Sequence, residues 1–205
     1  KSVNCVMKPE DNHHRYENPW TIKLWILVLA HLAGTLNIVS VLAMAPVISG
    51  VLELNATEFG FLVSVYYGGQ AIFSMPSGFL VDRYGIGKIL IVSHSVMALA
   101  AITLGLSKSY ELALFSLFLM GLGYSMTNPA TGRAVLIWFS PDRRGTAMGI
   151  KQVGVPLGGV IAAGNGALVS IFPWQNIMLA VGFFIMLNGI FCLNLLKHEI
   201  KDKDQ

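Results

Sequence analysis

Two strongly basic residues, Arg133 and Lys151, lie inside long apolar segments of the chain. A cation removed from water is costly unless an anion or another hydrogen-bond acceptor lies close to it. Both residues stand within about two helical turns of the same polar stretch, residues 140–144. If they face a shared cavity, they would attract an anion such as an organic carboxylate. The competing interpretation is snorkelling, in which the long side chains carry their charges to a wet interface.

Uncharged polar residues at mid-depth of the apolar segments are further candidates for contacting a solute: Asn37, Tyr66, Gln70, Tyr124 and Asn128. Each costs free energy in lipid, so it either faces a cavity or bonds to a neighbouring helix. We keep both interpretations open. Arg133 lies about 180° from Tyr124 around a helix, which favours snorkelling for this arginine. Lys151 lies close to the glycines of its own segment, and for it the two interpretations are balanced.

Other chemistry is weakly represented. His31 and His94 are single imidazoles in apolar segments, and for each we favour packing over a proton relay. His13 and His14 with Cys5 could hold a metal, but a solvated tail explains them better. We find neither a Gly-x-Ser-x-Gly nor a His-Glu-x-x-His motif, and we expect no disulfide, cofactor or metal. An enzyme is therefore not predicted.

The elements that must position these residues are membrane-spanning helices. Hydrophobic residues make up 54% of the chain and charged residues 12%, as expected for a protein whose solvent is lipid. A span needs about 20 mainly apolar residues, and six windows qualify: 22–48, 57–81, 87–107, 111–139, 145–171 and 174–197. Because backbone groups in lipid must be paired internally and these runs lack a strand-like alternation, the predicted fold class is an all-α bundle.

The domain organisation follows from the same windows. Residues 1–21 form a predicted cytoplasmic tail, 22–197 the six-helix membrane domain, and 198–205 a second tail or the start of a linker. One predicted side carries nearly all basic residues outside the spans, whereas the other carries Lys108 beside Glu53, Glu58 and Glu111. The positive-inside rule therefore predicts a multi-pass protein of the plasma or inner membrane with both termini in the cytoplasm. This bias also explains the basic isoelectric point, so no nucleic-acid partner is predicted.

Local signals support the divisions between windows. Asn55 followed by Glu58 at the third position predicts a capped helix start. Pro141 and Pro173 mark breaks after the fourth and fifth windows, because proline lacks the amide hydrogen that a continuing helix needs. The links are short, which predicts antiparallel neighbours.

The turn between the second and third windows carries a distinctive set of residues: Gly78, Asp82, Arg83, Gly85 and Lys88. We expect Gly78 to allow a close helix contact and Gly85 to adopt a positive φ in a tight turn. This set resembles the loop between the second and third helices of the major facilitator superfamily. Two basic positions of that pattern are occupied here by Ile86 and Gly87.

The resemblance extends over nearly everything after residue 20, through Pro129, Trp138–Phe139, Arg144–Gly145 and residues 149–159. It implies the amino-terminal half of a twelve-helix transporter, whose first and fourth helices line a central cavity. In that family the loop's acidic and basic residues hold one conformation by contacts with the other half. By resemblance, Asp82 and Arg83, with Arg144 nearby, would form such a latch here.

The fifth window is rich in small residues at four-residue spacing: Gly145, Gly149, Gly154, Gly158, Ala162 and Gly166. Such spacing predicts a smooth face on which another helix can lie closely. Gly154, Pro156, Gly158 and Gly159 partly resemble a Gly-Pro-x-x-Gly-Gly element of proton-coupled antiporters, but Val155 separates the first glycine from the proline. We therefore favour close packing with a proline kink over antiport.

Together these observations predict a secondary transporter that moves a small solute, such as an organic anion, by alternating access. An ion gradient, symport included, or the solute's own gradient would drive it. The expected partners are the solute, a coupling ion, the lipid bilayer and a missing carboxyl-terminal six-helix half. The alternative is a six-helix scaffold or regulatory half-protein that transports nothing. Substrate identity is not predicted.

Overall fold

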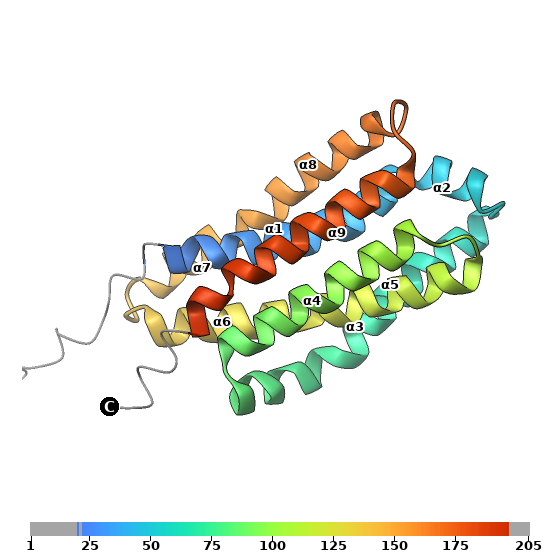
Figure 1. The fold of residues 1–205 in the computed structure, drawn as a ribbon. Coiled ribbons are helices and arrows are strands. Elements are labelled where there is room, and N and C mark those ends of the chain that lie inside the picture. Colours follow the sequence, from blue (N-terminus) through green and yellow to red (C-terminus); the bar gives the residue numbers. More distant parts are fainter. Residues whose placement is uncertain (1–19, 21, 197–205) are drawn as a thin grey trace, which may run out of the picture.

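The computed structural model describes Trp20 and residues 22–196, and all regular structure in this part is α-helical. The helices are α1 (Ile22–Ala43), α2 (Ala45–Val51), α3 (Ala56–Tyr84), α4 (Ile86–Gly105), α5 (Tyr110–Ser125), α6 (Thr127–Trp138), α7 (Arg144–Gln152), α8 (Gly154–Leu168) and α9 (Trp174–Phe191). They run lengthwise through one elongated bundle (Figure 1). The cysteine and histidines of the amino-terminal tail, and the basic residues of both tails, lie outside the described residues.

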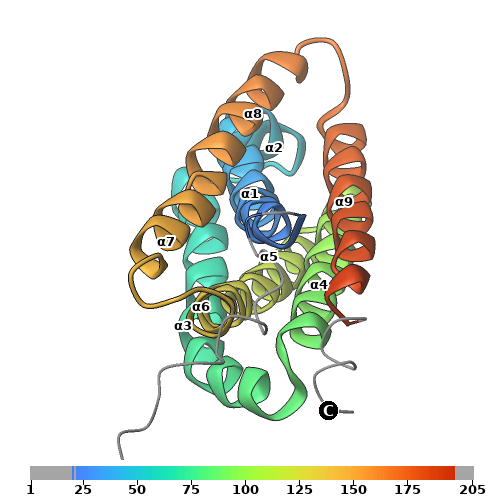
Figure 2. The ribbon, with the colours of Figure 1, turned by 90° about the vertical axis from the view of Figure 1, so that its left-hand side faces the viewer.

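The bundle is built around α1. Its main neighbour is α8, while α4 packs against α9 and α3 against α5. Seen along the bundle, α1 lies in the middle, with α8 and α9 on either side of it (Figure 2). Most of α1 is buried, including its polar residues His31, Asn37 and Ser40. Residues on this helix therefore mainly contact other helices of the same chain.

Every predicted window contains helix, but three windows are interrupted. The first divides at Met44 into α1 and α2, the fourth at Met126 into α5 and α6, and the fifth at Val153 into α7 and α8. A proline follows each break within three residues: Pro46, Pro129 and Pro156. Because proline has no amide hydrogen, it leaves the carbonyl four residues earlier without its helical partner. The fifth window is thus interrupted three residues before Pro156, in the segment where a proline kink was predicted.

The break in the fourth window is compensated by neighbouring helices. Pro129 cannot bond to the Ser125 carbonyl. This oxygen instead lies 3.2 Å from the hydroxyl of Ser77 in α3, which shares its hydrogen with the Ser74 carbonyl oxygen of its own helix at 2.7 Å. The Gly123 carbonyl accepts a hydrogen bond of 2.7 Å from Ser93 of α4. Side chains from two other helices thus satisfy carbonyls exposed by the break, as burial requires.

By length and composition, four described helical stretches can cross a membrane: Ile22–Ala43, Ile86–Gly105, Arg144–Leu168 and Trp174–Leu196. A fifth span is added if α2 and α3, which meet at 115°, are taken as one. Neither α5 nor α6 reaches the usual spanning length alone, with 16 and 12 residues. The described chain is therefore an all-helical bundle with four or five clear spans, compared with the six windows expected.

The predicted local signals at the ends of α3 are confirmed. Asn55 accepts hydrogen bonds of 2.9 Å from the amides of Thr57 and Glu58, and Glu58 accepts one of 2.8 Å from the Asn55 amide. This is the reciprocal capping box. At the other end, Gly85 has φ 91° and separates α3 from α4. Only glycine adopts this conformation without a steric penalty, which explains the tight reversal.

Candidate substrate site

Lys151 lies in a buried cluster that also contains His31 and Thr131. Its Nζ atom is 3.1 Å from Thr131 Oγ1 and 3.2 Å from His31 Nε2, and those two atoms are 3.0 Å apart. Lys151 is 4% exposed, and the other two side chains are fully buried. We call these three residues the buried cluster. It joins α1, α6 and α7, although its members are separated by up to 120 positions in the sequence.

Glycines of α8 determine how closely α8 packs against α1 beside this cluster. A Cβ atom at Gly154 would lie 2.1 Å from the Val28 carbonyl oxygen, and one at Gly158 would lie 2.6 Å from that of Leu32. These glycines therefore permit a helix contact that a larger residue would prevent. The predicted close packing is found, and its partner is α1 of the same chain. Because Lys151 stands three residues before Gly154, this contact holds the lysine against α1.

Not all small residues of this segment serve that contact. Cβ atoms built at Gly145, Gly149 and Gly159 would have nothing within 4 Å, and Pro156 is exposed. The same is true of Gly78 in α3, where we expected a close helix neighbour. These positions lie on open faces of the described chain.

The charge of Lys151 is not neutralised within the described part of the chain. Lys151 makes no ion pair with an Asp or Glu there, and its polar contacts are the neutral Thr131 and an imidazole. The Thr131 hydroxyl donates to the Thr127 carbonyl oxygen at 2.8 Å, so its oxygen is left to accept from the ammonium. A buried ammonium with this environment has hydrogen-bond acceptors but no counter-charge.

Arg133 has a different environment. Its Nη1 atom forms an ion pair with Asp82 of α3, and the two side chains are 45% and 59% exposed. The pair connects the end of α3 to α6, within the same chain. Arg133 thus does not join Lys151 in one cationic site in this conformation. Its charge is partly wet, as the snorkelling interpretation expected, and it is also paired.

The remaining residues of the expected latch occupy separate positions. Arg144 donates to the carbonyl oxygens of Leu136 at 2.8 Å and Phe139 at 3.2 Å, so it caps the end of α6. Arg83 lies 5.5 Å from the centre of the Tyr84 ring, a cation–π distance. Lys88 is exposed at the start of α4. Of the expected group, the structure links Asp82 to α6 directly.

Two of the uncharged candidates serve packing within the chain. The Asn37 amide donates to the Met97 carbonyl oxygen at 3.4 Å and so joins α1 to α4. Tyr66 is 1% exposed and lies where α3 crosses α5, near Gly121. Neither side chain reaches the buried cluster through a recorded contact. Their burial matches the interhelical alternative considered for them.

The other uncharged candidates are more accessible. Gln70 and Tyr124 are half-buried, and Asn128 is exposed on α6. The Tyr124 ring packs on Gly34 of α1, where a Cβ atom would lie 2.1 Å from a ring carbon. Tyr124 therefore contacts α1 at a position three residues after His31, the member of the buried cluster that α1 contributes.

Sequence reasoning assigned His31 to packing and did not connect Thr131 to any site. His94, treated in the same way, does bond within its own helix, with Nδ1 2.7 Å from the Leu90 carbonyl oxygen. His31 instead contacts two other helices. One sequence contains no signal that pairs positions so far apart, because the register of α1 on α8 decides which residues meet.

An apolar groove lies away from these residues. It has a volume of about 390 Å³ and is lined by α1, α8 and α9, with apolar side chains apart from Asn165 and Asn176. Asn165 uses its amide to donate to Ser40 Oγ at 2.7 Å. An apolar groove open at the side of a bundle holds no charged group, so we place the candidate site at the buried cluster.

Comparison with known proteins identifies the family. A sequence profile described as the Major Facilitator Superfamily matches residues 26–205. This chain belongs to the major facilitator superfamily, a family of membrane transporters, and the resemblance deduced from the loop is confirmed.

Relatives are found among bacterial transporters. The chain is 30% identical over 188 residues to the hexuronate transporter of Bacillus subtilis, covering 89% of this chain and 43% of that protein. It is 24% identical over 160 residues to a probable sulfoacetate transporter, SauU, of Cupriavidus necator, covering 78% of this chain and 37% of the relative. The chain thus spans less than half the length of these curated relatives.

Solved structures support the fold. A crystal structure of a bacterial homologue of the human lysosomal transporter Spinster, inward-facing and unoccupied, matches with a TM-score of 0.74 and 19% identity. The match covers 86% of this chain and 43% of that one. At this identity the likeness concerns the fold alone.

Proposed function

We propose that this chain is the amino-terminal six-helix half of a secondary transporter that carries a small organic anion. The six spans would be α1 with α2, α3, α4, α5 with α6, α7 with α8, and α9. Substrate would bind between this half and a carboxyl-terminal one, and rocking of the halves would expose it to each side in turn. The coverage of the relatives, below one half, supports a second half of similar size.

The observation that carries the anion assignment is the buried, uncompensated charge of Lys151. Burying an ammonium costs free energy, and such a group is retained mainly where a ligand or a partner supplies a counter-charge. An anionic substrate would provide the missing counter-charge. The names of two relatives, a hexuronate transporter and a probable sulfoacetate transporter, both refer to anions and support the same substrate class.

Glycine faces on α3 and α7 support the missing half. Gly68 and Gly78 of α3, and Gly145 and Gly149 of α7, meet nothing within 4 Å of a built Cβ. Small residues at open helix faces suit close contact with further helices. In this proposal the Asp82–Arg133 pair lies at the cytoplasmic end and contributes to a latch that the second half completes.

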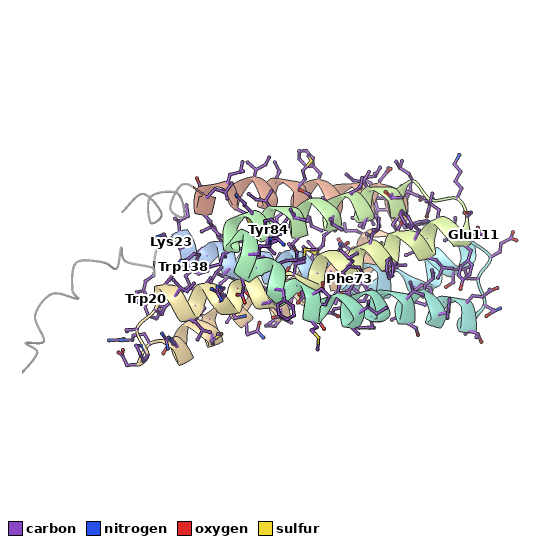
Figure 3. The ribbon with its side chains drawn as sticks, turned by 90° about the horizontal axis from the view of Figure 1, so that it is seen from below. Trp20, Lys23, Phe73, Tyr84, Glu111 and Trp138 are labelled. Atoms are coloured by element: carbon purple, nitrogen blue, oxygen red, sulfur yellow. The ribbon has the colours of Figure 1, made fainter. Side chains whose placement is uncertain are left out.

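The orientation in the membrane is also part of the proposal. Trp20, Lys23 and Trp138 gather at one end of the bundle, and Glu111 lies at the opposite end (Figure 3). Lys23 Nζ is 5.8 Å from the centre of the Trp138 ring. Tryptophan and lysine favour the membrane interface, and basic residues favour the cytoplasmic one. We therefore place this end, and both termini, on the cytoplasmic side.

Uptake into proteoliposomes tests the function. The transporter, expressed at the full length of its coding sequence, would be assayed with a hexuronate, sulfoacetate and an uncharged sugar. Loss of one partner of a buried charge contact typically lowers binding by about 30-fold or more, so Lys151→Gln is expected to reduce anion uptake to that extent. Lys108→Gln removes the same charge from an exposed position and should have no effect. Unchanged uptake in Lys151→Gln would exclude this anion site.

A further inference from the structure

The apolar groove between α8 and α9 takes no part in the proposed transport. These helices follow each other in the chain, but α8 packs mainly against α1 and α9 mainly against α4. They lie on either side of α1 (Figure 2). The groove between them, which Leu36 of α1 also lines, has a volume of about 390 Å³. Ligand sites in proteins typically have volumes of about 300–1,000 Å³. The groove therefore has room for one small molecule.

The groove extends over about the depth of one membrane leaflet. Its lining on α9 runs from Asn176 to Phe184, a rise of about 12 Å along the helix. The hydrocarbon core of a bilayer is about 30 Å thick, so one leaflet contributes about 15 Å. A transmembrane helix of a partner protein would need a groove along the whole core. Neighbouring apolar side chains, such as Val160 and Phe183, are exposed. The dimensions and surroundings of the groove thus fit a lipid chain better than a partner helix.

The polar residues of the groove lie toward one of its ends. Asn165 stands three residues before the end of α8, and Asn176 stands two residues after the start of α9. Because the two helices are joined by a short link there, both residues lie toward the same end of the bundle. Ile161 and Phe184 line the groove farther from that link. This arrangement matches a molecule with a polar head and an apolar chain.

Asn165 offers a hydrogen-bond acceptor that the described chain does not use. The Ser40 hydroxyl donates to the Leu36 carbonyl oxygen of its own helix, so Ser40 Oγ accepts from Asn165 Nδ2 at 2.7 Å. This fixes the orientation of the amide and turns its oxygen away from Ser40. Asn165 is 8% exposed, and its Oδ1 atom has no hydrogen-bond partner among the described residues, although protein does not enclose it. A nearly buried acceptor without a donor costs free energy. A ligand in the groove could supply that donor.

The lining of the groove restricts the charge of such a ligand. It contains no charged side chain among the residues that the structure describes. An ammonium or a carboxylate bound there would lose its water without gaining a counter-charge, which is costly. A hydroxyl group is a neutral donor and avoids this cost. The groove therefore favours an uncharged alcohol with an apolar chain.

We propose that this groove binds one molecule of a neutral single-chain lipid alcohol, such as a fatty alcohol or a monoacylglycerol. Its hydroxyl donates to Asn165 Oδ1, and its chain lies along α9 and reaches Ile161 and Phe184. The site faces lipid and is separate from the buried cluster, so it does not depend on the proposed anion site. Because the bound molecule contacts α1, α8 and α9 together, it stabilises their arrangement.

Photolabelling tests the site directly. The full-length transporter in phosphatidylcholine nanodiscs would be irradiated with a decanol that carries a diazirine in its chain, and mass spectrometry would locate the label. We expect saturable labelling of the groove residues of α8 and α9, which an unlabelled monoacylglycerol displaces. The matched probe is the same diazirine on decane, without the hydroxyl, at equal concentration in the bilayer. The hydroxyl should raise the affinity about three- to tenfold, as expected for one neutral hydrogen bond.

Three variants separate the groove from the rest of the lipid-facing surface. Ala180→Trp fills the groove that Ala180 lines and should remove the saturable labelling. Val160→Trp, at a position 72% exposed on α8 and outside the lining, is the matched control and should label as wild type. Asn165→Leu removes the acceptor, so it should bind the alcohol and the alkane equally, with an affinity for the alcohol about three- to tenfold below that of the wild type.

The results that would overturn the proposal are distinct. Labelling that does not saturate, or saturable labelling that persists in Ala180→Trp, would show that the groove is not a site. Equal affinities of the wild type for the alcohol and the alkane would refute the hydroxyl contact. Because both probes are compared on the wild type, this contact is tested even if Asn165→Leu does not fold. None of these measurements involves anion uptake, so this site can fail or stand without the proposed function.

Discussion

The buried cluster and the Asp82–Arg133 pair place a cation in opposite surroundings. Lys151 is 4% exposed and has no acidic partner in the described chain, whereas Arg133 is 45% exposed and ion-paired. An exposed pair changes stability little, and its charges remain partly hydrated. A buried charge without a partner lowers stability, so a function must maintain it. The comparison therefore supports the proposed substrate contact at Lys151 and the proposed conformational role of the exposed pair.

The largest expected effect concerns Lys151 itself. Lys151→Met keeps an unbranched side chain, one atom shorter, and removes its charge, so the free energy of unfolding should rise by about 1–4 kcal/mol while anion uptake is lost. Thermal unfolding in detergent, beside the uptake assay, measures both changes. A destabilised Lys151→Met variant would show that the ammonium is structural and would remove the contrast between the two regions.

The second effect concerns the helix contact on which the buried cluster depends. Gly154→Ala places a Cβ atom 2.1 Å from the Val28 carbonyl oxygen, so α1 and α8 must move apart. Overpacking of this kind lowers the free energy of unfolding by about 1–3 kcal/mol, and anion affinity should fall with it. Gly159→Ala is the matched control, because its Cβ atom meets nothing within 4 Å. Equal effects at the two positions would contradict the role of this contact.

A smaller effect is expected at the exposed pair. A double-mutant cycle of Asp82→Asn and Arg133→Gln should give a coupling free energy of about 0.2–1 kcal/mol, which added salt should reduce. Chemical denaturation of the four proteins in detergent measures it. A coupling of several kcal/mol would mean that the pair is desolvated in the assembled transporter and resembles the buried cluster more than it differs from it.

The smallest effect concerns Asp142, a fully exposed charge between α6 and α7. A hydrogen bond from the Ser140 hydroxyl, with a smaller contribution from the adjacent Arg143, holds the pKa of Asp142 below its ordinary value. A lowered folded-state pKa means that Asp142 stabilises the fold above the unfolded-state pKa and that this contribution disappears as pH falls through the folded-state pKa. Ser140→Ala should move the pKa upward, as carboxyl NMR titration would show. An unchanged pKa would contradict the hydrogen bond as its main cause.

The sequence allowed good prediction of features that depend on local physics. The six apolar windows all contain helix, Asn55 and Glu58 form the expected cap, and Gly85 adopts the expected positive φ. Each follows from residues within a few positions of one another. The division of the fourth window at Met126 was not expected, although Pro129 could have indicated it. Proline in a buried helix is tolerated where other helices satisfy the freed carbonyls, and the sequence does not show whether they do.

The candidate site was less predictable because it depends on contacts between distant helices. Lys151 was identified from its type and position, but its neighbours His31 and Thr131 were not. Arg133 was grouped with Lys151 by depth, yet helical rotation directs it to Asp82 instead. Depth in a membrane can be read from one sequence, whereas the rotation and register of each helix depend on packing against all the others.

Because α6 is separated from α5 at Met126, it is a short rod of 12 residues, about 18 Å long. This rod carries Thr131, bonded to Lys151, and two positions later Arg133, bonded to Asp82. Two residues are about 200° apart around a helix, so the bonds leave the rod on opposite sides. Rotation of α6 about its axis would therefore strain the Thr131–Lys151 and Arg133–Asp82 contacts together. In the proposed function, solute binding at Lys151 and the Asp82–Arg133 pair would therefore act on the same short helix.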